Sequence, residues 1–220
     1  MRAGQRAGQR AARRAVRGWR AIARSEPATA RAQHPTPWNA CRTPRPPLTT
    51  HAATVRGLGW TPVGVDLSSA MLAHAADRLP VVRADAQHLP IRTRTLDAVI
   101  AVMVHTDMPG YAQVLAQAAR VLRPGGTFIH IGVHPCFCGG FVDRTAPEAT
   151  VIRPGYLGTG YWTKDSWTSN GIRAKVGATH WPLTDLLHMV TDAGLVLERF
   201  VEGGAPTPTT LSLRAGKPRR

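Results

Sequence analysis

The sequence predicts an α/β fold, in which a mostly parallel sheet carries helices on both faces and ends in an antiparallel hairpin. Three observations predict this fold. Short apolar runs alternate with helical patterns from residue 60 onward, as in chains built from strand–helix–strand units. The segment Leu96–Val104 is an apolar run, typical of a strand that is buried on both faces. Two final apolar segments, 195–201 and 210–214, are joined by a turn rich in glycine and proline, which indicates a hairpin.

The elements expected from residue 49 onward follow one another in a regular order. The first is a short helix, which Thr49 or Thr50 can cap and Gly59 can end. Arg123-Pro-Gly-Gly126 should end a later helix, because proline and glycine interrupt the helical pattern. The expected strands cover 63–65, 81–85, 96–104, 127–133, 195–201 and 210–214, and the expected helices cover 49–58, about 68–78, about 110–122 and 183–193.

Residues 1–48 are expected to form a basic, proline-rich leader of low complexity that is disordered, ahead of a domain over 49–215. The leader opens with a repeat of Arg-Ala-Gly-Gln and has few large apolar side chains, so it cannot bury a core. Residues 1–60 hold 12 arginines and one acid, Glu26, in a chain with a net charge of +15. Because most of the excess charge precedes the domain, it is poor evidence for a nucleic-acid partner.

Cysteine usage and hydropathy bear on the compartment. The three cysteines, Cys41, Cys136 and Cys138, do not make a disulfide framework, so the simplest expectation is a reducing cytoplasm. No apolar run approaches the roughly 18 residues of a membrane span, and the amino terminus lacks the apolar core of a secretory signal. The sequence therefore predicts no membrane association and leaves the oligomeric state open.

Asp66 stands where open α/β sheets bind a ligand. It follows the short strand 63–65 directly, and Ser68 or Ser69 then caps the next helix. A carboxylate at the carboxyl end of a parallel strand can accept hydrogen bonds from both hydroxyls of a nucleoside ribose. The alternative is that Asp66 only helps to cap the helix, and the segment alone does not choose between these two interpretations.

Residues 60–132 resemble the class I S-adenosylmethionine-dependent methyltransferases, in particular the methyltransferase-11 (UbiE-like) group. The resemblance rests on several motifs in the right order. These are Val63-Gly-Val-Asp-Leu-Ser68, Met71-Leu72, Ala84-Asp-Ala86 with Leu89-Pro90, Leu96-Asp-Ala-Val99 and Ala119-Arg-Val-Leu-Arg-Pro-Gly-Gly126. The resemblance implies a Rossmann-like sheet, S-adenosylmethionine as the cofactor, and methyl transfer to a small-molecule acceptor.

The resemblance also implies individual roles. Asp66 would hold the ribose hydroxyls, Asp85 the adenine amine, and the backbone N–H of Ala86 a ring nitrogen. Residues after the third expected strand of the domain would flank the methyl group. The implied cofactor-binding residues are Asp66, Leu67, Met71, Asp85, Ala86, Val102 and Met103. A sulfonium is already an activated methyl donor, so orientation of the acceptor and exclusion of water do most of the catalytic work.

One departure from the family pattern affects the first strand. The family places a Gly-rich loop between its first strand and first helix, but Asn39–Leu48 contain no glycine, no acid and no apolar strand. We therefore expect the first strand to be absent or degraded, and residues before about 49 not to be the family's native amino terminus. A reading-frame error or a start codon assigned too far upstream would produce such a sequence. The alternative function is a non-catalytic or truncated remnant that lacks the cofactor loop.

Two histidines are candidate general bases, because imidazole has a pKa near neutrality. His105 and His134 each follow an expected strand that opens toward the ligand crevice, although either could merely line a loop. His134 also belongs to a cluster with His130, Cys136 and Cys138, whose spacing is not that of the usual zinc knuckles. We therefore predict no metal site.

The segment 134–182 is expected to be an irregular, aromatic-rich insertion. It is too long for a simple connection, and loops of this length are usually lids or binding segments. Its aromatic residues could form the floor of an apolar or aromatic acceptor site, or could only close the open end of the sheet. The candidates are Tyr156, Tyr161, Trp162 and Trp167. A nicotinamide-binding enzyme remains a weaker interpretation, since it needs the same missing Gly-rich turn.

Overall fold

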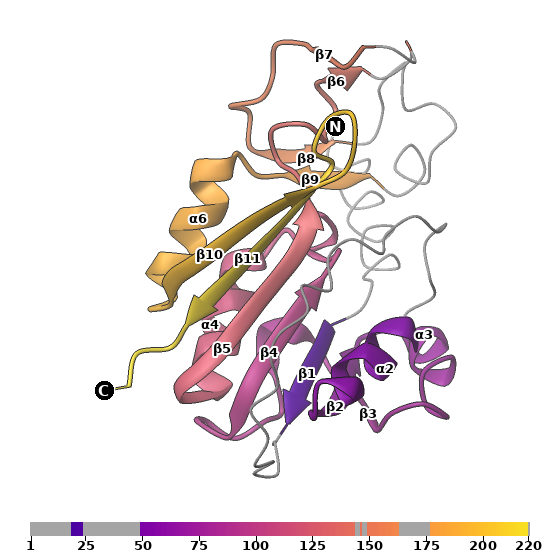
Figure 1. Cartoon of the computed structure of the whole chain (residues 1–220), viewed down its shortest axis with the longest axis vertical. Helices are drawn as coiled ribbons and strands as arrows, with labels where there is room; N and C mark the ends of the chain where they lie inside the picture. The colour runs from indigo at the N-terminus through magenta and orange to yellow at the C-terminus, as the bar shows by residue number, and fades with distance from the viewer. Residues whose placement is uncertain (1–18, 24–48, 144–145, 147–148, 163–176, 220) are drawn as a thin grey trace, which may run out of the picture.

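The computed structural model describes residues 19–23, 49–143, 146, 149–162 and 177–219, which form the expected α/β architecture (Figure 1). A seven-stranded sheet has the order β10-β11-β5-β4-β1-β2-β3. Its strands are β1 (Trp19–Ala23), β2 (Thr61–Asp66), β3 (Val81–Arg83), β4 (Leu96–Val102), β5 (Leu122–Val133), β10 (Val196–Gly203) and β11 (Thr210–Gly216). The helices are α2 (Thr49–Gly57), α3 (Ser69–Ala73), α4 (Tyr111–Val121) and α6 (Leu183–Asp192), with 3₁₀ turns η2 (Ala86–His88) and η3 (His105–Asp107).

Five strands of the sheet run in the same direction, namely β2, β3, β4, β5 and β10. β2 pairs in parallel with β3, and β4 pairs in parallel with β5. β1 is antiparallel to both β2 and β4, so these two pairs are parallel to one another. The carboxyl ends of β2, β3, β4 and β5 therefore meet at one edge, which we call the carboxyl edge. The last two strands form the predicted antiparallel hairpin beside β5.

The position between β2 and β4, where the family's first strand was expected to be absent or degraded, is filled by a strand of opposite direction. Trp19–Ala23, within the predicted leader, forms β1 between β2 and β4, where Trp19 pairs with Val65 and Ala101. A gap there would leave rows of backbone donors and acceptors unpaired in the middle of the sheet. Five residues of the predicted leader thus belong to the sheet, and the disorder expected for residues 1–48 stays a prediction. β1 runs antiparallel to its neighbours, so its carboxyl end lies at the edge opposite the carboxyl edge.

The core lies mainly where α4 and α6 pack on the sheet. Val114 and Leu115 of α4 and Leu186 of α6 are fully buried in the same apolar cluster as Phe128 of β5. A second, smaller cluster joins α2 to the region after α3, with Ala52, Ala75 and Leu79. Successive residues of β4 are buried, which means that both faces of this strand are covered, as its apolar sequence predicts.

The segment 134–182 is more ordered than expected. It contributes two short antiparallel hairpins rather than only irregular chain. One pairs β6 (Val142–Asp143) with β7 (Val151–Ile152), and the other pairs β8 (Gly160–Trp162) with β9 (Ala178–His180). Figure 1 shows both hairpins beyond the carboxyl edge, at the end of the molecule away from α2 and α3. We call these two hairpins, together with the described residues 153–159 that join them, the cap.

Two local expectations have mixed outcomes. α4 ends at Val121, just before Arg123-Pro-Gly-Gly126, as the proline and glycine predict. Lys217 satisfies the helix end, since its Nζ donates to the carbonyls of Ala119 (2.6 Å) and Leu122 (2.7 Å). The helix expected over 68–78 is shorter and ends at Ala73.

Within the described part of the chain, no helix is long and apolar enough to cross a membrane.

Candidate functional site

Asp66 ends β2 at the carboxyl edge, and the residue is only 6% exposed. Its Oδ1 accepts a hydrogen bond from the backbone N–H of Ser68 at 2.7 Å. Ser68, rather than Asp66, is the N-cap of α3, because the Ser68 hydroxyl accepts from the Met71 N–H at 3.4 Å. Asp66 therefore shapes the strand–helix turn through Oδ1, and it lies at the carboxyl end of a parallel strand.

Asp85 lies beside this turn, two residues after β3. The parallel pairing sets Asp66 opposite Arg83, and the Ala84 N–H donates to the Asp66 carbonyl at 3.1 Å. Asp85 Oδ1 accepts from the Gln87 N–H at 2.9 Å, which caps η2, while 43% of the Asp85 side chain remains exposed. The two predicted carboxylates thus stand at adjacent strand ends, and Asp85 remains accessible to a ligand.

Met103, after β4, has an unusual backbone conformation. Its φ angle is 53°, in the left-handed region that non-glycine residues rarely adopt. The Met103 N–H donates to the carbonyl of Ile131 at 2.6 Å, which ties this turn to β5. Met103 is 39% exposed and Leu67 is 37% exposed, so both carry apolar surface at the carboxyl edge. Strained residues of this kind gather at ligand sites.

His105 is placed near the end of β4 but is buried. It opens η3 and is 2% exposed. Its ring contacts the ring of His130 in a T-shaped arrangement, with centroids 4.9 Å apart, and lies 6.0 Å from the ring of Tyr111. The sequence pattern did not single out Tyr111 as part of this group. The only sequence signal for it was a polar ring at the start of an otherwise apolar helical stripe.

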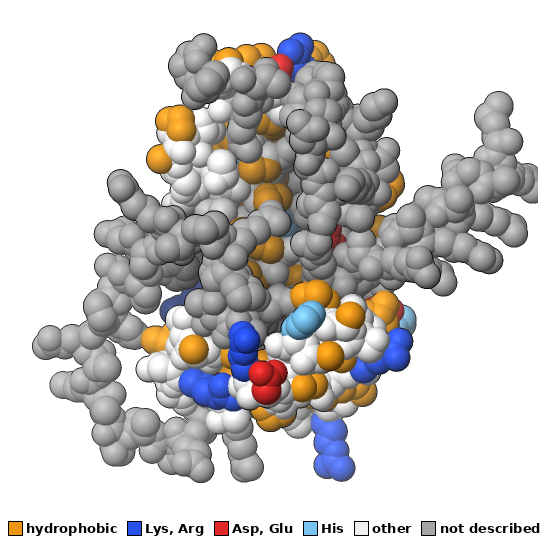
Figure 2. Space-filling model, turned by 90° about the vertical axis from the view of Figure 1, so that its right-hand side faces the viewer, with side chains coloured by type: hydrophobic (Ala, Val, Ile, Leu, Met, Phe, Trp, Pro, Cys, Tyr) orange, Lys and Arg blue, Asp and Glu red, His pale blue; other side chains and the backbone are white. Residues whose placement is uncertain are grey.

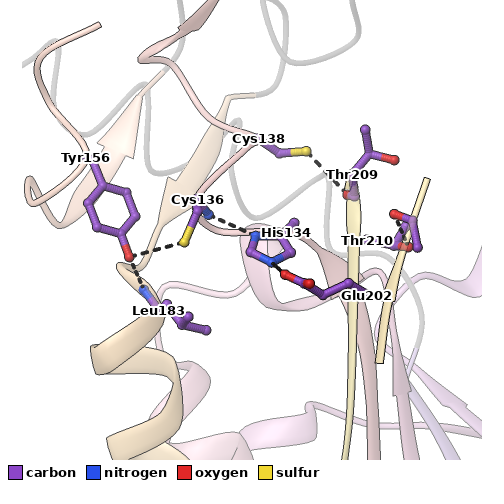
Figure 3. A network of polar contacts seen from close by, with 9 residues as sticks. His134, Cys136, Cys138, Tyr156, Leu183, Glu202, Thr209 and Thr210 are labelled. Atoms are coloured by element: carbon purple, nitrogen blue, oxygen red, sulfur yellow. Dashed lines mark hydrogen bonds and ion pairs between the residues drawn. The ribbon is translucent and has the colours of Figure 1, made fainter. Parts of the chain in front are cut away.

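His134 has both ring nitrogens engaged within the chain (Figure 3). Nδ1 accepts from the Cys136 N–H at 3.1 Å, so the ring hydrogen lies on Nε2, which donates to Glu202 Oε1 at 2.7 Å. Glu202 belongs to β10, 68 residues away in the chain. In this arrangement His134 offers a substrate no unengaged nitrogen. Its predicted role as a base would require one of these bonds to break.

Among the described aromatic residues of the insertion, Tyr156 makes the largest number of contacts that can be named. Tyr156 packs against Phe141 and His180, and its hydroxyl accepts from the Leu183 N–H at 2.9 Å. The pKa of Tyr156 is raised, mainly by burial, and the pKa of His180 is lowered by burial. Tyr156 is therefore anchored inside the cap.

Tyr161 and Trp162 occupy β8 of the cap. Tyr161 is 45% exposed, and its ring lies against Gly177, which has a φ angle of 66° and no space for a side chain. Trp162 is partly buried. Trp167 lies outside the described residues.

The histidine–cysteine cluster makes other contacts. His134 bonds Glu202, and Cys138 Sγ donates to the Thr209 carbonyl at 3.3 Å. Cys136 Sγ donates to the Tyr156 hydroxyl at 3.5 Å. Within the described ranges, no group of three or more His, Cys, Asp or Glu side chains could hold a metal ion.

Figure 2 shows the face on the β2–β3 side of the molecule. On the lower part of this face the described basic, acidic and hydrophobic side chains are interspersed. No single kind of side chain gathers there into a patch.

Sequence matches to known proteins cover mainly the first half of the domain. The family described as "Methyltransferase domain" matches residues 48–130. A phthiotriol/phenolphthiotriol dimycocerosates methyltransferase of Mycobacterium leprae is 34% identical over 85 residues, which are 39% of this chain and 31% of that protein. A fatty-acid O-methyltransferase of Mycolicibacterium smegmatis is 36% identical over 89 residues, 38% of this chain and 32% of that protein. The matches thus span about a third of the length of these relatives.

Solved structures match over a longer stretch of the chain. An S-adenosylmethionine-dependent methyltransferase from Mesorhizobium loti has a TM-score of 0.58 and 20% identity, covering 70% of this chain and 79% of that one. The PH0226 protein from Pyrococcus horikoshii has a TM-score of 0.53 and 19% identity, covering 76% of each chain.

These matches confirm the predicted resemblance. The fold is that of the S-adenosylmethionine-dependent methyltransferases, and residues 48–130 match their domain in sequence. Asp66, Asp85 and His105 lie inside the matched segment, whereas His134 and the cap lie outside it.

Proposed function

We propose that this protein transfers a methyl group from S-adenosylmethionine to a small, largely apolar acceptor. The observation that carries the proposal is the pair Asp66 and Asp85. Asp66 ends β2 and Asp85 follows the adjacent parallel strand β3, and both lie inside the segment that matches the methyltransferase domain. Carboxylates at this edge of an open α/β sheet are suited to the hydroxyl and amine donors of an adenosine.

The described residues fit the adenosine half of the cofactor. Asp66 would hold the ribose and Asp85, which is partly exposed, would accept from the adenine amine. The Ala86 N–H would reach a ring nitrogen, with Leu67 and Met71 packed beside the base. Arg83 supports this half, because its Nε donates to the Leu67 carbonyl at 3.2 Å. The cofactor would supply a sulfonium-activated methyl group.

The part of the site that would hold the methionine end of the cofactor differs from the adenosine part. Val102 and Met103 would flank the methyl group, and the strained Met103 backbone supports a ligand-binding role there. β1 leads away from the carboxyl edge, so the described residues provide no strand–glycine loop–helix unit to cradle the methionine end. This difference is the basis of the alternative, a non-catalytic remnant.

The chemistry asks little of the side chains. The acceptor's lone pair forms a bond to the methyl carbon as the carbon–sulfur bond breaks, and the acceptor's proton needs a base. His105 and His134 are our candidates for this base, and His134 already donates Nε2–H to Glu202 and accepts from Cys136 through Nδ1.

An apolar acceptor is supported by the cap and by the relatives. The relatives are named for a dimycocerosate lipid and for fatty acids as substrates. The cap exposes large apolar side chains near the carboxyl edge, and Tyr161, Trp162 and Trp167 remain proposed acceptor contacts. The exposed apolar residues of the cap are Val151, Ile152, Leu157 and Tyr161. We also propose that the protein is located in the cytoplasm.

Calorimetric titration with S-adenosylhomocysteine tests the proposal directly. Folded wild-type protein should bind it, and Asp66→Asn should weaken binding about 10- to 100-fold, since a hydrogen bond to a charged group is worth about 1.5–3 kcal/mol. Asp77→Asn is the matched control, because Asp77 is an exposed acid shortly after α3 and should leave the affinity unchanged. A folded wild type that gives no binding heat would favour the remnant.

A further inference from the structure

The cap exposes large apolar side chains beyond the carboxyl edge. Val151 and Ile152 of β7 are 46% and 47% exposed, and Leu157, between β7 and β8, is 80% exposed. Hydrophobic side chains are also visible at the upper end of the molecule in Figure 2, the end where Figure 1 shows the cap. Single exposed apolar residues are ordinary, but several in one region of a surface indicate an interaction site.

A tight turn sets the exposure of Leu157. The Gly158 N–H donates to the Gly155 carbonyl at 3.0 Å, and Gly155 has a φ angle of 126°, which favours glycine. The Tyr156 hydroxyl accepts from the Leu183 N–H at 2.9 Å, which fixes one central residue of the turn against α6. Leu157 is the other central residue, and its side chain is directed to solvent.

Contacts on both sides hold this turn in place. The Tyr156 ring packs against the rings of Phe141 and His180, at 5.6 and 5.7 Å between centroids. On the other side, Thr159 Oγ1 donates to Asp185 Oδ2 of α6 at 3.0 Å. The turn therefore presents an apolar side chain to water in a fixed position, at a cost in free energy that a partner covering it would offset.

The distribution of charge indicates the kind of partner. Between residues 149 and 162 the sequence has one charged residue, Arg153, whose Nη2 donates to Asp143 Oδ2 at 2.6 Å. Residues 134–182 hold five Lys and Arg against three Asp and Glu, and the whole chain has a net charge of +15. A nearly uncharged apolar tip on a basic chain fits a lipid surface with anionic headgroups, where apolar contact and electrostatic attraction act together.

A second copy of the chain fits this surface less well. Two copies would each bring a net charge of +15, and like charges repel one another. An anionic lipid surface offers the opposite charge together with apolar chains beneath it.

We propose that Leu157, Val151 and Ile152 dock the cap on a lipid bilayer with anionic headgroups, from which the acceptor reaches the carboxyl edge. The choice of a lipid surface rests on the proposed methyl transfer to an apolar acceptor. The sequence predicted no membrane association because no apolar run is long enough to span a bilayer, whereas docking at the surface needs no such run.

Co-sedimentation of the full chain with lipid vesicles tests the proposal. The wild type should bind vesicles of equal parts phosphatidylglycerol and phosphatidylcholine more tightly than vesicles of phosphatidylcholine alone. Leu157→Ser should weaken binding to the mixed vesicles about tenfold, because an exposed leucine would no longer leave water on docking. The double variant Val151→Ser with Ile152→Ser should weaken it as well.

Leu58→Ser is the matched control. Leu58 is 60% exposed and follows α2, at the end of the molecule away from the cap. Its substitution should change vesicle binding by less than about twofold, since it lies far from the cap. The basic leader is the same in every variant, so the comparison isolates the contribution of the cap.

Several outcomes would overturn the inference. A wild type that binds neither kind of vesicle, or binds both equally, would do so, as would equal losses in Leu157→Ser and Leu58→Ser. Sedimentation velocity that shows a wild-type dimer, dissociated by Leu157→Ser, would assign the surface to a second copy. Urea unfolding should give the same midpoint for Leu157→Ser and the wild type, and a lower midpoint would show that the chain itself covers Leu157.

The affinity for S-adenosylhomocysteine separates this inference from the proposed function. It should change by less than about twofold in Leu157→Ser, because the substitution lies outside the proposed cofactor site. Absence of binding in the wild type would contradict the proposed function, while the vesicle experiment would still report on the docking surface.

Discussion

The two halves of the carboxyl edge differ in how their polar groups are used. At the ends of β2 and β3, Asp66 and Asp85 each engage a backbone N–H within two residues, and Asp85 stays partly exposed. On β5 and just after it, polar side chains also bond to distant parts of the chain, as His134 does to Glu202 and His130 to Tyr111. The first half is built from local turns, whereas the second half depends on tertiary packing.

This difference implies that the two halves should respond differently to perturbation. Changes beyond β4 and β5 should alter stability and the acceptor side, but leave the affinity for S-adenosylhomocysteine nearly unchanged. Loss of cofactor affinity through any of the changes below would contradict the division into two halves.

Acidification should have the largest effect on the second half. The pKa of His130 is about 4 in the folded protein and about 6.5 in an unfolded chain, so only the unfolded state gains a proton between these values. The contribution of His130 to the free energy of unfolding is therefore fully present above pH 6.5. It is lost as the pH falls toward 4, and the loss amounts to up to about 3 kcal/mol.

Urea unfolding at pH 7.5 and pH 5 measures this loss, which should be about 2 kcal/mol at pH 5. Burial also lowers the pKa of His180, so His180 acts in the same direction. The His130→Asn variant should lose less stability than the wild type over the same interval. An equal loss in both proteins would assign the effect to other groups.

Gly132→Ala should have the next largest effect. The added methyl would meet the His105 and His130 rings at 2.5–2.6 Å, and overpacking of a core costs about 1–3 kcal/mol. Gly57→Ala is the matched control, since no atom lies within 4 Å of its added Cβ, and it should be neutral or slightly stabilising. Thermal unfolding compares the two, and equal effects would show that the rings are not closely packed.

Glu202→Gln should have the smallest effect. Its partner His134 is buried, but the Glu202 side chain is 57% exposed, so the loss should stay below about 1 kcal/mol. Glu198→Gln, which breaks an exposed ion pair with Arg214, is the control and should cost less. Chemical denaturation of both variants measures the difference. A larger loss in Glu198→Gln would show that burial of His134 adds nothing to the pair.

Several features of the fold could be predicted because they are recorded in short stretches of sequence. The apolar run of β4 indicated a strand covered on both faces, and glycine and proline after Val121 indicated the end of α4. Asp66 and Asp85 follow apolar strands directly, so their place at the carboxyl edge follows from strand direction alone. Local patterns report burial and turns, and these decide the order of the elements.

Other features depend on which distant segments meet, and no local pattern reports that. β1 lies between β2 and β4, where a gap would leave backbone groups of the sheet unpaired. The sequence of residues 19–23 alone does not indicate this central position. The partner of His134 is 68 residues away, and that of Tyr111 is 19 residues away across the helix–sheet interface. Apolar periodicity and strand ends determined the sheet and its two carboxylates. Tertiary packing decided which histidine stays bonded to a carboxylate and which is held between rings, since only burial and long-range contacts distinguish them.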